Sequence, residues 1–341
     1  MPSTKVNIYF RADGNSKIGL GHIFRCLAVA EMIYAHYSCY FLIKEPGEHV
    51  RKMILPFAKV IELNIDISLE DEIRALSHYV TLNDILVIDS YLLDSNYQAN
   101  AIKKVKKLIA IDDEALFHFY ADIVINHASP LMAQYYSKEP KTKILAGPKY
   151  LIAREAFRKS ATNQRSVHEI KSLFICMGGA DPFNITCKVL DAAKKSLFNH
   201  IVVVTGIAYK HAEVLLKLCD LDHIEWKPNL SADEIVNEIT KCDVAVCTAS
   251  TISLEICCVK VGLLTGIVAE NQQNIHQCLL DNGCAHTIGD FREATVDEIT
   301  WQLNRLCDAD IVKNQMKQQL LLIDGESGTR ILEMINKLAN E

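Results

Sequence analysis

Short runs rich in Val and Ile recur along this 341-residue chain at the spacing of alternating strands and helices. A first series of runs lies at 6–10, 40–43, 59–63, 85–88, 108–111 and 123–125, and a second at 173–177, 201–205, 244–247 and 263–268. Apolar runs of this length, separated by helical patterns, are typical of parallel sheets buried on both faces. The sequence therefore predicts an α/β protein with two Rossmann-like domains.

The two series are separated by a polar stretch, 159–171, that has no strand pattern. We interpret it as a linker between an N-terminal domain, 1–158, and a C-terminal domain, 172–341. The length of the chain suits two domains of ordinary size. The last segment, 328–338, has the pattern of an amphipathic helix, and such a helix can cross back onto the first domain. A ligand site is expected in the cleft beside the linker.

The composition disfavours several kinds of partner. The formal net charge is −6 and no long Lys/Arg block occurs, so nucleic acid and anionic membranes are not expected. No apolar stretch approaches the ~20 residues of a membrane span, and residues 1–5 lack signal-peptide features, so we expect a soluble cytoplasmic protein. The 12 cysteines form no Cys-x-x-Cys pair and are interpreted as reduced core residues. The oligomeric state stays open, with a monomer favoured.

The loop after the first strand, 11–25, lies at the carboxyl end of that strand, where α/β proteins bind ligands. Its first charged residues are Arg11 and Asp13, and a Gly-Leu-Gly-His sequence follows. Phe24 stands where a dinucleotide fingerprint needs its third glycine, and no Gly-Lys-Ser/Thr sequence occurs. Neither NAD nor ATP is expected, and no cofactor is predicted.

His22 is the candidate catalytic base of this loop. It lies at a helix start, where the positive end of the helix dipole disfavours the imidazolium form. Gly21 before it lets a substrate approach the backbone closely. Arg25 lies one turn further on the same helix face and is a candidate for binding a carboxylate or phosphate. The alternatives are a histidine that only caps the helix and an arginine that is paired with Asp13.

A glycine turn in the second half is a candidate phosphate site. Gly178 and Gly179 stand between a strand and a helix for which Asp181 is the expected N-cap and Pro182 the first helical residue. The exposed backbone N–H groups of such a turn can bind a diphosphate, with Asn184 close by. The alternative is an ordinary tight turn.

Polar residues also follow the next two strands of the second half. Ser250 and Thr251 begin a helix and offer a second anion site. Glu255 lies one residue too far along for a capping box, so its carboxylate is a candidate to accept both hydroxyls of a ribose. The amides of Asn271 and Gln272 are candidates for binding sugar hydroxyl or acetamido groups.

Taken in order, these motifs resemble the PseG-type nucleotide-sugar hydrolases of the pseudaminic acid pathway, which are relatives of the MurG-type glycosyltransferases with the GT-B fold. The resemblance covers essentially the whole chain. It rests on Arg11-Ala12-Asp13, Gly19-Leu20-Gly21-His22-Ile23-Phe24-Arg25-Cys26, Asp89-Ser90-Tyr91, Ile111-Asp112-Asp113, Ala121-Asp122 with Asn126, Ala146-Gly147 with Tyr150 and Arg154, Gly178-Gly179-Ala180-Asp181, Ser253-Leu254-Glu255 and Asn271-Gln272.

The resemblance implies metal-free hydrolysis of UDP-2,4-diacetamido-2,4,6-trideoxy-β-L-altropyranose to UDP and the free sugar. It implies that His22 is the base, that Glu255 binds the uridine ribose and that Arg154 contacts the substrate. We expect water to attack the anomeric carbon with inversion, while Asp13, Asp89 and Tyr91 orient the sugar or the water. The alternatives are a GT-B glycosyltransferase that uses a UDP-sugar donor, and a non-catalytic nucleotide-sugar-binding protein.

Overall fold

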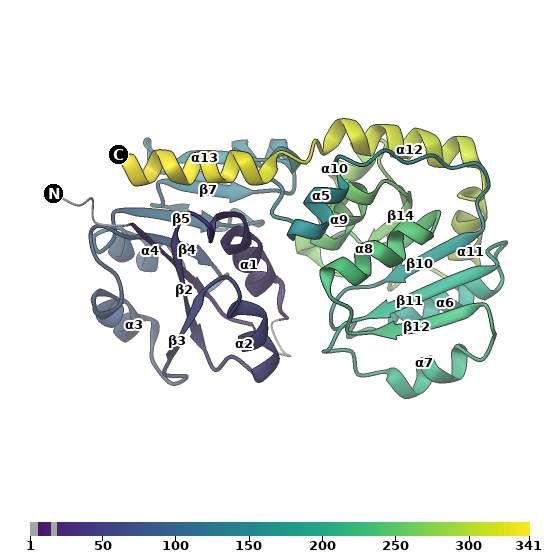
Figure 1. Ribbon diagram of the computed structural model, residues 1–341, viewed down its shortest axis with the longest axis horizontal. Coiled ribbons are helices and arrows are strands. Elements are labelled where there is room, and N and C mark those ends of the chain that lie inside the picture. The colour runs from purple at the N-terminus through teal and green to yellow at the C-terminus, as the bar shows by residue number, and fades with distance from the viewer. Residues whose placement is uncertain (1–5, 15–18) are drawn as a thin grey trace. The chain divides into compact units, whose positions relative to one another are not determined.

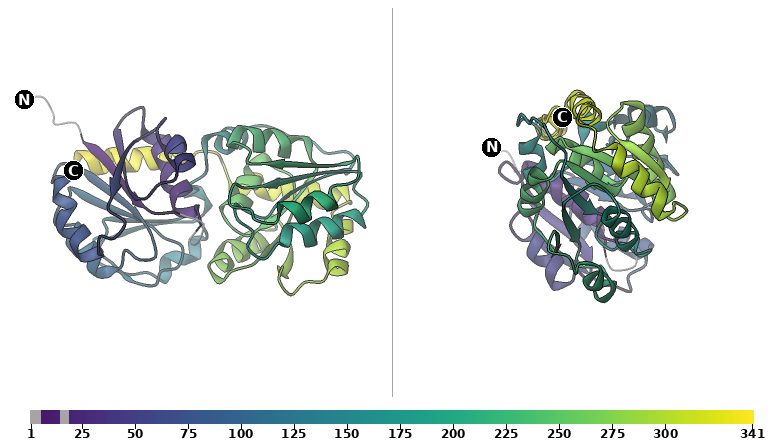
Figure 2. Two further views of the ribbon diagram at one scale, coloured as in Figure 1. Left: turned by 90° about the horizontal axis from the view of Figure 1, so that it is seen from below. Right: turned by 90° about the vertical axis from the view of Figure 1, so that its right-hand side faces the viewer.

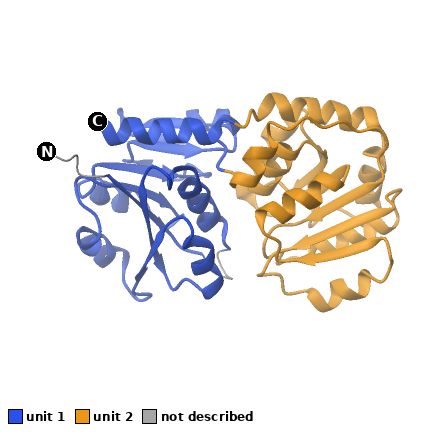
Figure 3. Cartoon of the chain, viewed as in Figure 1, with its two compact units in different colours: residues 1–152, 326–341 blue, residues 153–325 orange. Residues whose placement is uncertain are grey.

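The computed structural model describes residues 6–14 and 19–341. The chain forms two compact units, one made of Met1–Ile152 and Glu326–Glu341 and the other of Ala153–Gly325 (Figures 1 and 3). The N-terminal residues considered for a signal peptide, and residues 15–18 of the glycine loop, lie outside the described part of the chain.

Unit 1 is built on a parallel sheet with the strand order β3-β2-β1-β4-β5-β7-β9. Its strands are β1 (Asn7–Ala12), β2 (Ser38–Lys44), β3 (Lys59–Leu63), β4 (Ile85–Asp89), β5 (Lys107–Ile111), β7 (Ile123–Asn126) and β9 (Lys143–Ala146), and a separate small sheet pairs β6 (His118–Phe119) with β8 (Ser137–Lys138). The helices and 3-10 turns are α1 (Gly21–Ile33), α2 (Glu48–Ile54), α3 (Leu69–Ala75), η1 (Leu76–His78), α4 (Ser95–Ala101), η2 (Pro130–Gln134), η3 (Pro148–Tyr150) and α13 (Ser327–Asn340).

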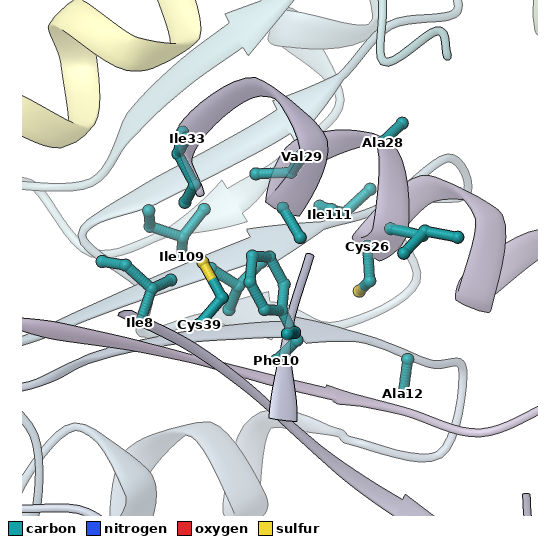
Figure 4. Packing of buried hydrophobic residues seen from close by; sticks show 14 of the residues in the cluster. Ile8, Phe10, Ala12, Cys26, Ala28, Val29, Ile33, Cys39, Ile109 and Ile111 are labelled. Carbon is teal, nitrogen blue, oxygen red and sulfur yellow. The ribbon is translucent and has the colours of Figure 1, made fainter. Parts of the chain in front are cut away.

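Helices cover both faces of this sheet (Figures 1 and 2). Because successive residues of a strand point to opposite faces, Ile8 and Phe10 of β1 pack against α1, whereas Tyr9 joins the core on the other side. Figure 4 shows Ile8 and Phe10 together with Cys26, Val29 and Ile33 of α1. This packing fixes the start of α1 at the carboxyl end of β1.

Unit 2 repeats the arrangement with the parallel order β12-β11-β10-β13-β14-β15. Its strands are β10 (Ser172–Cys176), β11 (His200–Thr205), β12 (Ile224–Pro228), β13 (Val244–Thr248), β14 (Gly262–Ile267) and β15 (His286–Asp290). The helices and one 3-10 turn are α5 (Glu155–Ser160), α6 (Ile185–Lys194), α7 (Ala212–Leu218), α8 (Ala232–Lys241), α9 (Thr251–Val259), η4 (Glu270–Gln272), α10 (Gln273–Asp281), α11 (Val296–Arg305) and α12 (Ala309–Leu322).

In each sheet the first strand of the unit has the second and third strands on one side. The fourth and later strands lie on its other side, which is the Rossmann order. The predicted α/β fold with two Rossmann-like domains is therefore confirmed.

The division between the units lies before α5 and not at the expected position after residue 158. Helix α5 packs against α8 and α9 of unit 2. After α5, the carbonyl oxygens of Ala161 and Asn163 accept hydrogen bonds from the buried ammonium group of Lys260 at 2.6 and 2.9 Å. The stretch 159–171 is thus part of unit 2. The sequence does not indicate this, because contacts to a lysine 97 to 99 residues away leave no periodic pattern.

The chain returns to unit 1 in α13, which buries Ile331, Ile335 and Leu338 in the core beside α1. All 12 cysteines are free, and most are buried. Within the part of the chain that the structure describes, no helix is long and apolar enough to cross a membrane.

Candidate active site

Polar side chains gather at the carboxyl edge of the unit 1 sheet. Strands β1, β4, β5 and β7 are neighbours in that order and run parallel, so their carboxyl ends meet at one edge. Asp89 ends β4, Asp113 follows β5 and His127 follows β7. Helix α1 begins at Gly21 and adds His22 and Arg25 to the same edge.

His22 and Arg25 share one buried carboxylate. His22 Nδ1 lies 2.6 Å from Asp89 Oδ1, and Arg25 donates through Nη2 to the same oxygen at 2.7 Å and through Nε to Oδ2 at 2.8 Å. Asp89 is 1% exposed. The Nη2 atom of Arg25 also lies 3.0 Å from His22 Nδ1, because both nitrogens point at the same acceptor.

The ionisation of Asp89 determines the tautomer of His22. Burial alone would raise the pKa of Asp89, but the charge of Arg25 and the hydrogen bonds from His22 and Arg25 hold this pKa below its usual value. An ionised carboxylate can only accept hydrogen bonds, so His22 Nδ1 carries the hydrogen. The neutral ring then has its lone pair on Nε2, as a general base requires.

Asp89 and Arg25 make hydrogen bonds to each other in the structure. Both were expected to bind the substrate, but both are buried and bonded to each other. Arg25 also donates through Nη1 to Asp113 Oδ2 at 2.6 Å. Burial alone would lower the pKa of Arg25, but the charges of Asp89 and Asp113 raise it well above its usual value. The two residues thus form the support of His22.

Two further residues at this edge were not predicted as candidates from the sequence. Asp113 entered only within a family motif, and His127 was not singled out. His127 Nδ1 accepts the backbone N–H of Ile152 at 3.3 Å. Burial and the charge of Arg25 lower the pKa of His127 to about 4, so its ring is neutral at ordinary pH. The topology alone brings these residues near Arg25, and no spacing in the sequence indicates it.

Two further candidates flank the histidine. The half-buried ring of Tyr91 meets the His22 ring edge-on, with the ring centres 4.7 Å apart. Asp13 pairs with Arg11 at 2.7 Å and accepts the backbone N–H of Lys44 at 2.9 Å, so the alternative of an Asp13–Arg25 pair is wrong. A Cβ atom built on exposed Gly21 would meet nothing within 4 Å, so this glycine is not required by packing and leaves open space beside His22.

The glycine turn of unit 2 differs from its predicted form. Helix α6 begins at Ile185, and its N-cap is Asn184 in the left-handed region, so Asp181 is not the N-cap and Pro182 is not the first helical residue. The Asp181 carboxylate instead accepts the N–H groups of Ile185 and Thr186 at 2.9 and 2.7 Å. The start of α6, which was expected to bind phosphate, is thus occupied by the Asp181 carboxylate.

The glycines themselves keep an unusual backbone. Gly178 has a φ of 92°, a region that favours glycine. A Cβ atom on Gly206 would lie 2.6 Å from the backbone of Gly179, so the end of β11 approaches this turn as closely as two backbones can. Neither Gly178 nor Gly179 has atoms within 4 Å of where a side chain would begin. The turn is therefore an open backbone surface at the end of β10.

The second expected anion site lies at the start of α9. Ser250 is the N-cap, but its side chain makes no capping hydrogen bond to the helix and lies 3.3 Å from the Thr248 hydroxyl. Thr251 begins the helix, and Ser253 turns its hydroxyl back to the Ser250 carbonyl oxygen at 2.7 Å. The positive end of the α9 dipole is thus not neutralised by an acidic residue in its first turn.

The two residues expected to bind the ribose and the substrate are bonded to each other. Arg154 donates to Glu255 through Nε at 2.9 Å, through Nη2 at 2.6 Å and through its backbone N–H at 3.2 Å. Glu255 is 3% exposed, and the Arg154 guanidinium also lies over the Phe157 ring at 4.8 Å. Both residues belong to unit 2, although Arg154 was expected in the first domain.

The remaining candidates lie after β14. Asn271 and Gln272 are half-buried in η4, before α10. Gln272 Oε1 accepts the backbone N–H of Val268 at 2.8 Å, so this side chain also holds its own loop.

Acidic pairs in the sequence do not form a metal centre in the described part of the chain. No group of three or more His, Cys, Asp or Glu side chains is arranged there to hold a metal ion. Of two Asp-x-Asp sequences in unit 2, one places Asp220 against Lys194, and the other places Asp308 on the N–H of Asp310 as the cap of α12.

The chain is similar in sequence to several known proteins. No family model matches the chain. Uncharacterized protein MJ1062 of Methanocaldococcus jannaschii is 31% identical over 217 residues, which cover 60% of this chain and 44% of that protein. The spore coat polysaccharide biosynthesis protein SpsG of Bacillus subtilis is 24% identical, with 96% of this chain and 97% of that protein covered. The UDP-2,4-diacetamido-2,4,6-trideoxy-β-L-altropyranose hydrolase of Campylobacter jejuni is 25% identical, with 82% and 97% covered.

Solved structures agree in fold. Acinetobacter baumannii MurG matches with a TM-score of 0.67 at 12% identity, over 97% of this chain and 99% of that one. A co-structure of S. aureus MnaA with UDP also matches with a TM-score of 0.67 at 12% identity, over 98% and 97%. The chain has the GT-B fold. The resemblance to the PseG-type hydrolases is confirmed by the Campylobacter jejuni relative, and the chain is thereby related to UDP-sugar enzymes.

Proposed function

We propose that the protein is a nucleotide-sugar hydrolase that releases UDP from UDP-2,4-diacetamido-2,4,6-trideoxy-β-L-altropyranose. The observation that carries the proposal is the buried Asp89 carboxylate that fixes the His22 ring, at the carboxyl edge of a Rossmann-like sheet. The relative from Campylobacter jejuni supports the substrate and the reaction. The proposed setting is cytoplasmic pseudaminic acid biosynthesis.

In the proposed reaction a water molecule attacks the anomeric carbon of the sugar. His22 Nε2 takes one proton of the water, and the other hydrogen stays on the new hydroxyl of the sugar. The C–O bond to the diphosphate breaks, and its electron pair leaves with UDP. A single displacement of this kind inverts the anomeric configuration. Asp89 stabilises the imidazolium that forms, as the carboxylate of a catalytic triad does.

Unit 2 is proposed to hold the UDP that departs. The amides of the Gly178–Gly179 turn and the start of α9 at Ser250 and Thr251 are the anion-binding groups, because fixed N–H dipoles stabilise charge that develops on a leaving group. Glu255 already accepts three hydrogen bonds from Arg154, so we propose that it releases Arg154 when it accepts the ribose hydroxyls. The released guanidinium is then available for the diphosphate.

The experiment is an assay of UDP release from the purified protein and the UDP-sugar in the absence of any acceptor. The hydrolase releases UDP and the free sugar, and His22→Asn loses at least about 99% of this turnover, since a placed base contributes about 10² to 10⁴-fold. UDP binding stays nearly unchanged in that variant. His36→Asn is the matched control, because His36 is exposed just after the far end of α1.

The same assay separates two alternatives. A glycosyltransferase is the second candidate, because the structural neighbours include glycosyltransferases such as CalG4, at a TM-score of 0.62. It releases UDP only after an acceptor is added. A non-catalytic binding protein retains the UDP-sugar intact under both conditions. Either result contradicts the hydrolase proposal.

A further inference from the structure

One guanidinium at the unit 1 edge bridges two carboxylates. Arg25 donates to Asp89 from two nitrogens, and its third nitrogen, Nη1, donates to Asp113 Oδ2 at 2.6 Å. The Asp113 side chain is 15% exposed and follows β5, which neighbours β4 in the sheet. Asp113 therefore binds the side of Arg25 that Asp89 leaves uncovered.

This bridge matters because Arg25 lies beside a group that must become positive. In the proposed reaction His22 takes a proton while Arg25 Nη2 lies 3.0 Å from its ring nitrogen. With Asp89 alone, the charges of Arg25 and Asp89 cancel, and no net charge remains to offset an imidazolium. With Asp113 the support carries one net negative charge, which favours the charged ring.

In the part of the chain that the structure describes, none of the other titratable groups around the histidine pairs with Arg25 as Asp113 does. His127 is neutral at ordinary pH, since its pKa is lowered to about 4. The rings of Tyr91 and His22 form a T-shaped pair. Burial and the neighbouring charges of Asp113 and Asp112 raise the pKa of Glu114, against the opposing charges of His22 and Arg25, and within the described residues Glu114 forms no ion pair with Arg25.

We propose that Asp113 is a positioning residue for the reaction. Its carboxylate neutralises the second side of Arg25, so that Arg25 can orient Asp89 beside a histidine that gains a positive charge. This inference rests on the proposed function. Arg25 and Asp113 act as a pair, and together they keep one net negative charge on the group that supports His22.

The test compares Asp113→Asn with the wild type. Asparagine keeps an oxygen acceptor for Arg25 Nη1 and removes one charge. A unit charge about 8 Å away, at an effective dielectric constant of about 20, changes the protonation equilibrium by about 30-fold. Because proton transfer is partial in the transition state, we expect kcat to fall about tenfold with KM within about twofold. Asp113→Glu restores most of kcat, and Asp66→Asn, an exposed charge change in the same unit, leaves kcat unchanged.

A second readout does not need activity. The ¹⁵N signals of the His22 ring, assigned with His22→Asn, are followed through a pH titration. In Asp113→Asn the ring takes up its proton about 1.5 pH units lower than in the wild type, which corresponds to the same change of about 30-fold. The double variant Arg25→Gln/Asp113→Asn also removes the positive charge that lies 3.0 Å from the ring nitrogen, so its ring takes up the proton at a higher pH than in Asp113→Asn.

The outcomes are distinguishable. If the wild type releases UDP and Asp113→Asn matches it in kcat and in the titration, the inference about Asp113 is overturned while the hydrolase proposal stands. If the titration moves as expected but the wild type releases no UDP, the proposed function fails and the electrostatic role of Asp113 stands. Equal titrations in the single and double variants contradict the net-charge argument.

Discussion

The substitution Asp89→Asn tests the support of His22 at its centre. Asp89 accepts three hydrogen bonds, at 2.6, 2.7 and 2.8 Å, and every one ends on His22 or Arg25. Asparagine has nearly the same size but replaces one accepting oxygen by a donating NH₂ group. That group must face either the histidine or the arginine, and neither orientation preserves all three bonds.

Both orientations have a calculable cost. If the NH₂ group faces His22, Nδ1 must accept, the ring hydrogen moves to Nε2 and the lone pair that takes the water's proton is lost. The expected fall in kcat is at least about 10²-fold, or about 2.7 kcal/mol in activation free energy. If the NH₂ group faces Arg25, a buried N–H group of Arg25 loses its acceptor. Breaking a buried pair costs about 3 to 5 kcal/mol of stability, and we expect the lower end because Asp113 still pairs with Arg25.

The ionisation of Asp89 also makes the free energy of unfolding depend on pH. The pKa of Asp89 is lowered in the folded protein, so its contribution to the free energy of unfolding is complete above the usual Asp value of about 3.9. This contribution is lost as the pH falls through the lower, folded-state pKa. The Asn variant lacks this part of the acid dependence, which urea unfolding at several pH values measures.

Asp84→Asn is the matched control. Asp84 is a buried carboxylate just before the amino end of the same strand, and it accepts hydrogen bonds from Asn7 and Thr81. This variant is expected to lose stability but to keep kcat for UDP release. If Asp89→Asn kept more than about a tenth of the wild-type kcat and also lost no stability, neither orientation would have its expected cost and the reasoning would be refuted.

Two further predictions concern the nucleotide and metal ions. Glu255→Gln weakens UDP binding, measured by calorimetry, more than it lowers kcat at saturating substrate, because a ribose contact is equal in the ground and transition states; a collapse of kcat at constant KM would reassign Glu255 to the chemistry. UDP release survives EDTA and does not increase with Mg²⁺ or Mn²⁺, because backbone amides are proposed to stabilise the diphosphate; activity that is lost on chelation and restored by one divalent ion would contradict this.

The central strands could be predicted from the sequence because both of their faces are buried. The runs at 85–88 and 173–177 correspond to β4 and β10 within one residue at each end. Strands β9, β12 and β15 were missed. Each lies at the edge of its sheet and has half-exposed or exposed residues, so none forms a continuous apolar run.

The candidate site could be predicted only in part. The glycine loop and its place at a strand end identify His22, but Asp89 lies 67 residues away and reaches it only through the order of the strands. The start of α6 was placed too early because Asp181 and Asn184 adopt positive φ, which delays the helix, and local residue preferences do not predict this. Whether a polar side chain faces a ligand or another side chain, as with Arg154 and Glu255, depends on contacts across the fold.

The position at which water attacks is the most direct test of the proposed reaction. Hydrolysis at the anomeric carbon and hydrolysis at phosphorus both yield soluble products, so product release alone does not separate them. The reaction is run in ¹⁸O-labelled water, with mass spectrometry of both products and NMR of the first anomer formed. The account predicts the label in the free sugar, none in UDP, and an inverted anomer. Label in the phosphate of UDP would show P–O cleavage and would contradict the role of His22 beside the anomeric carbon.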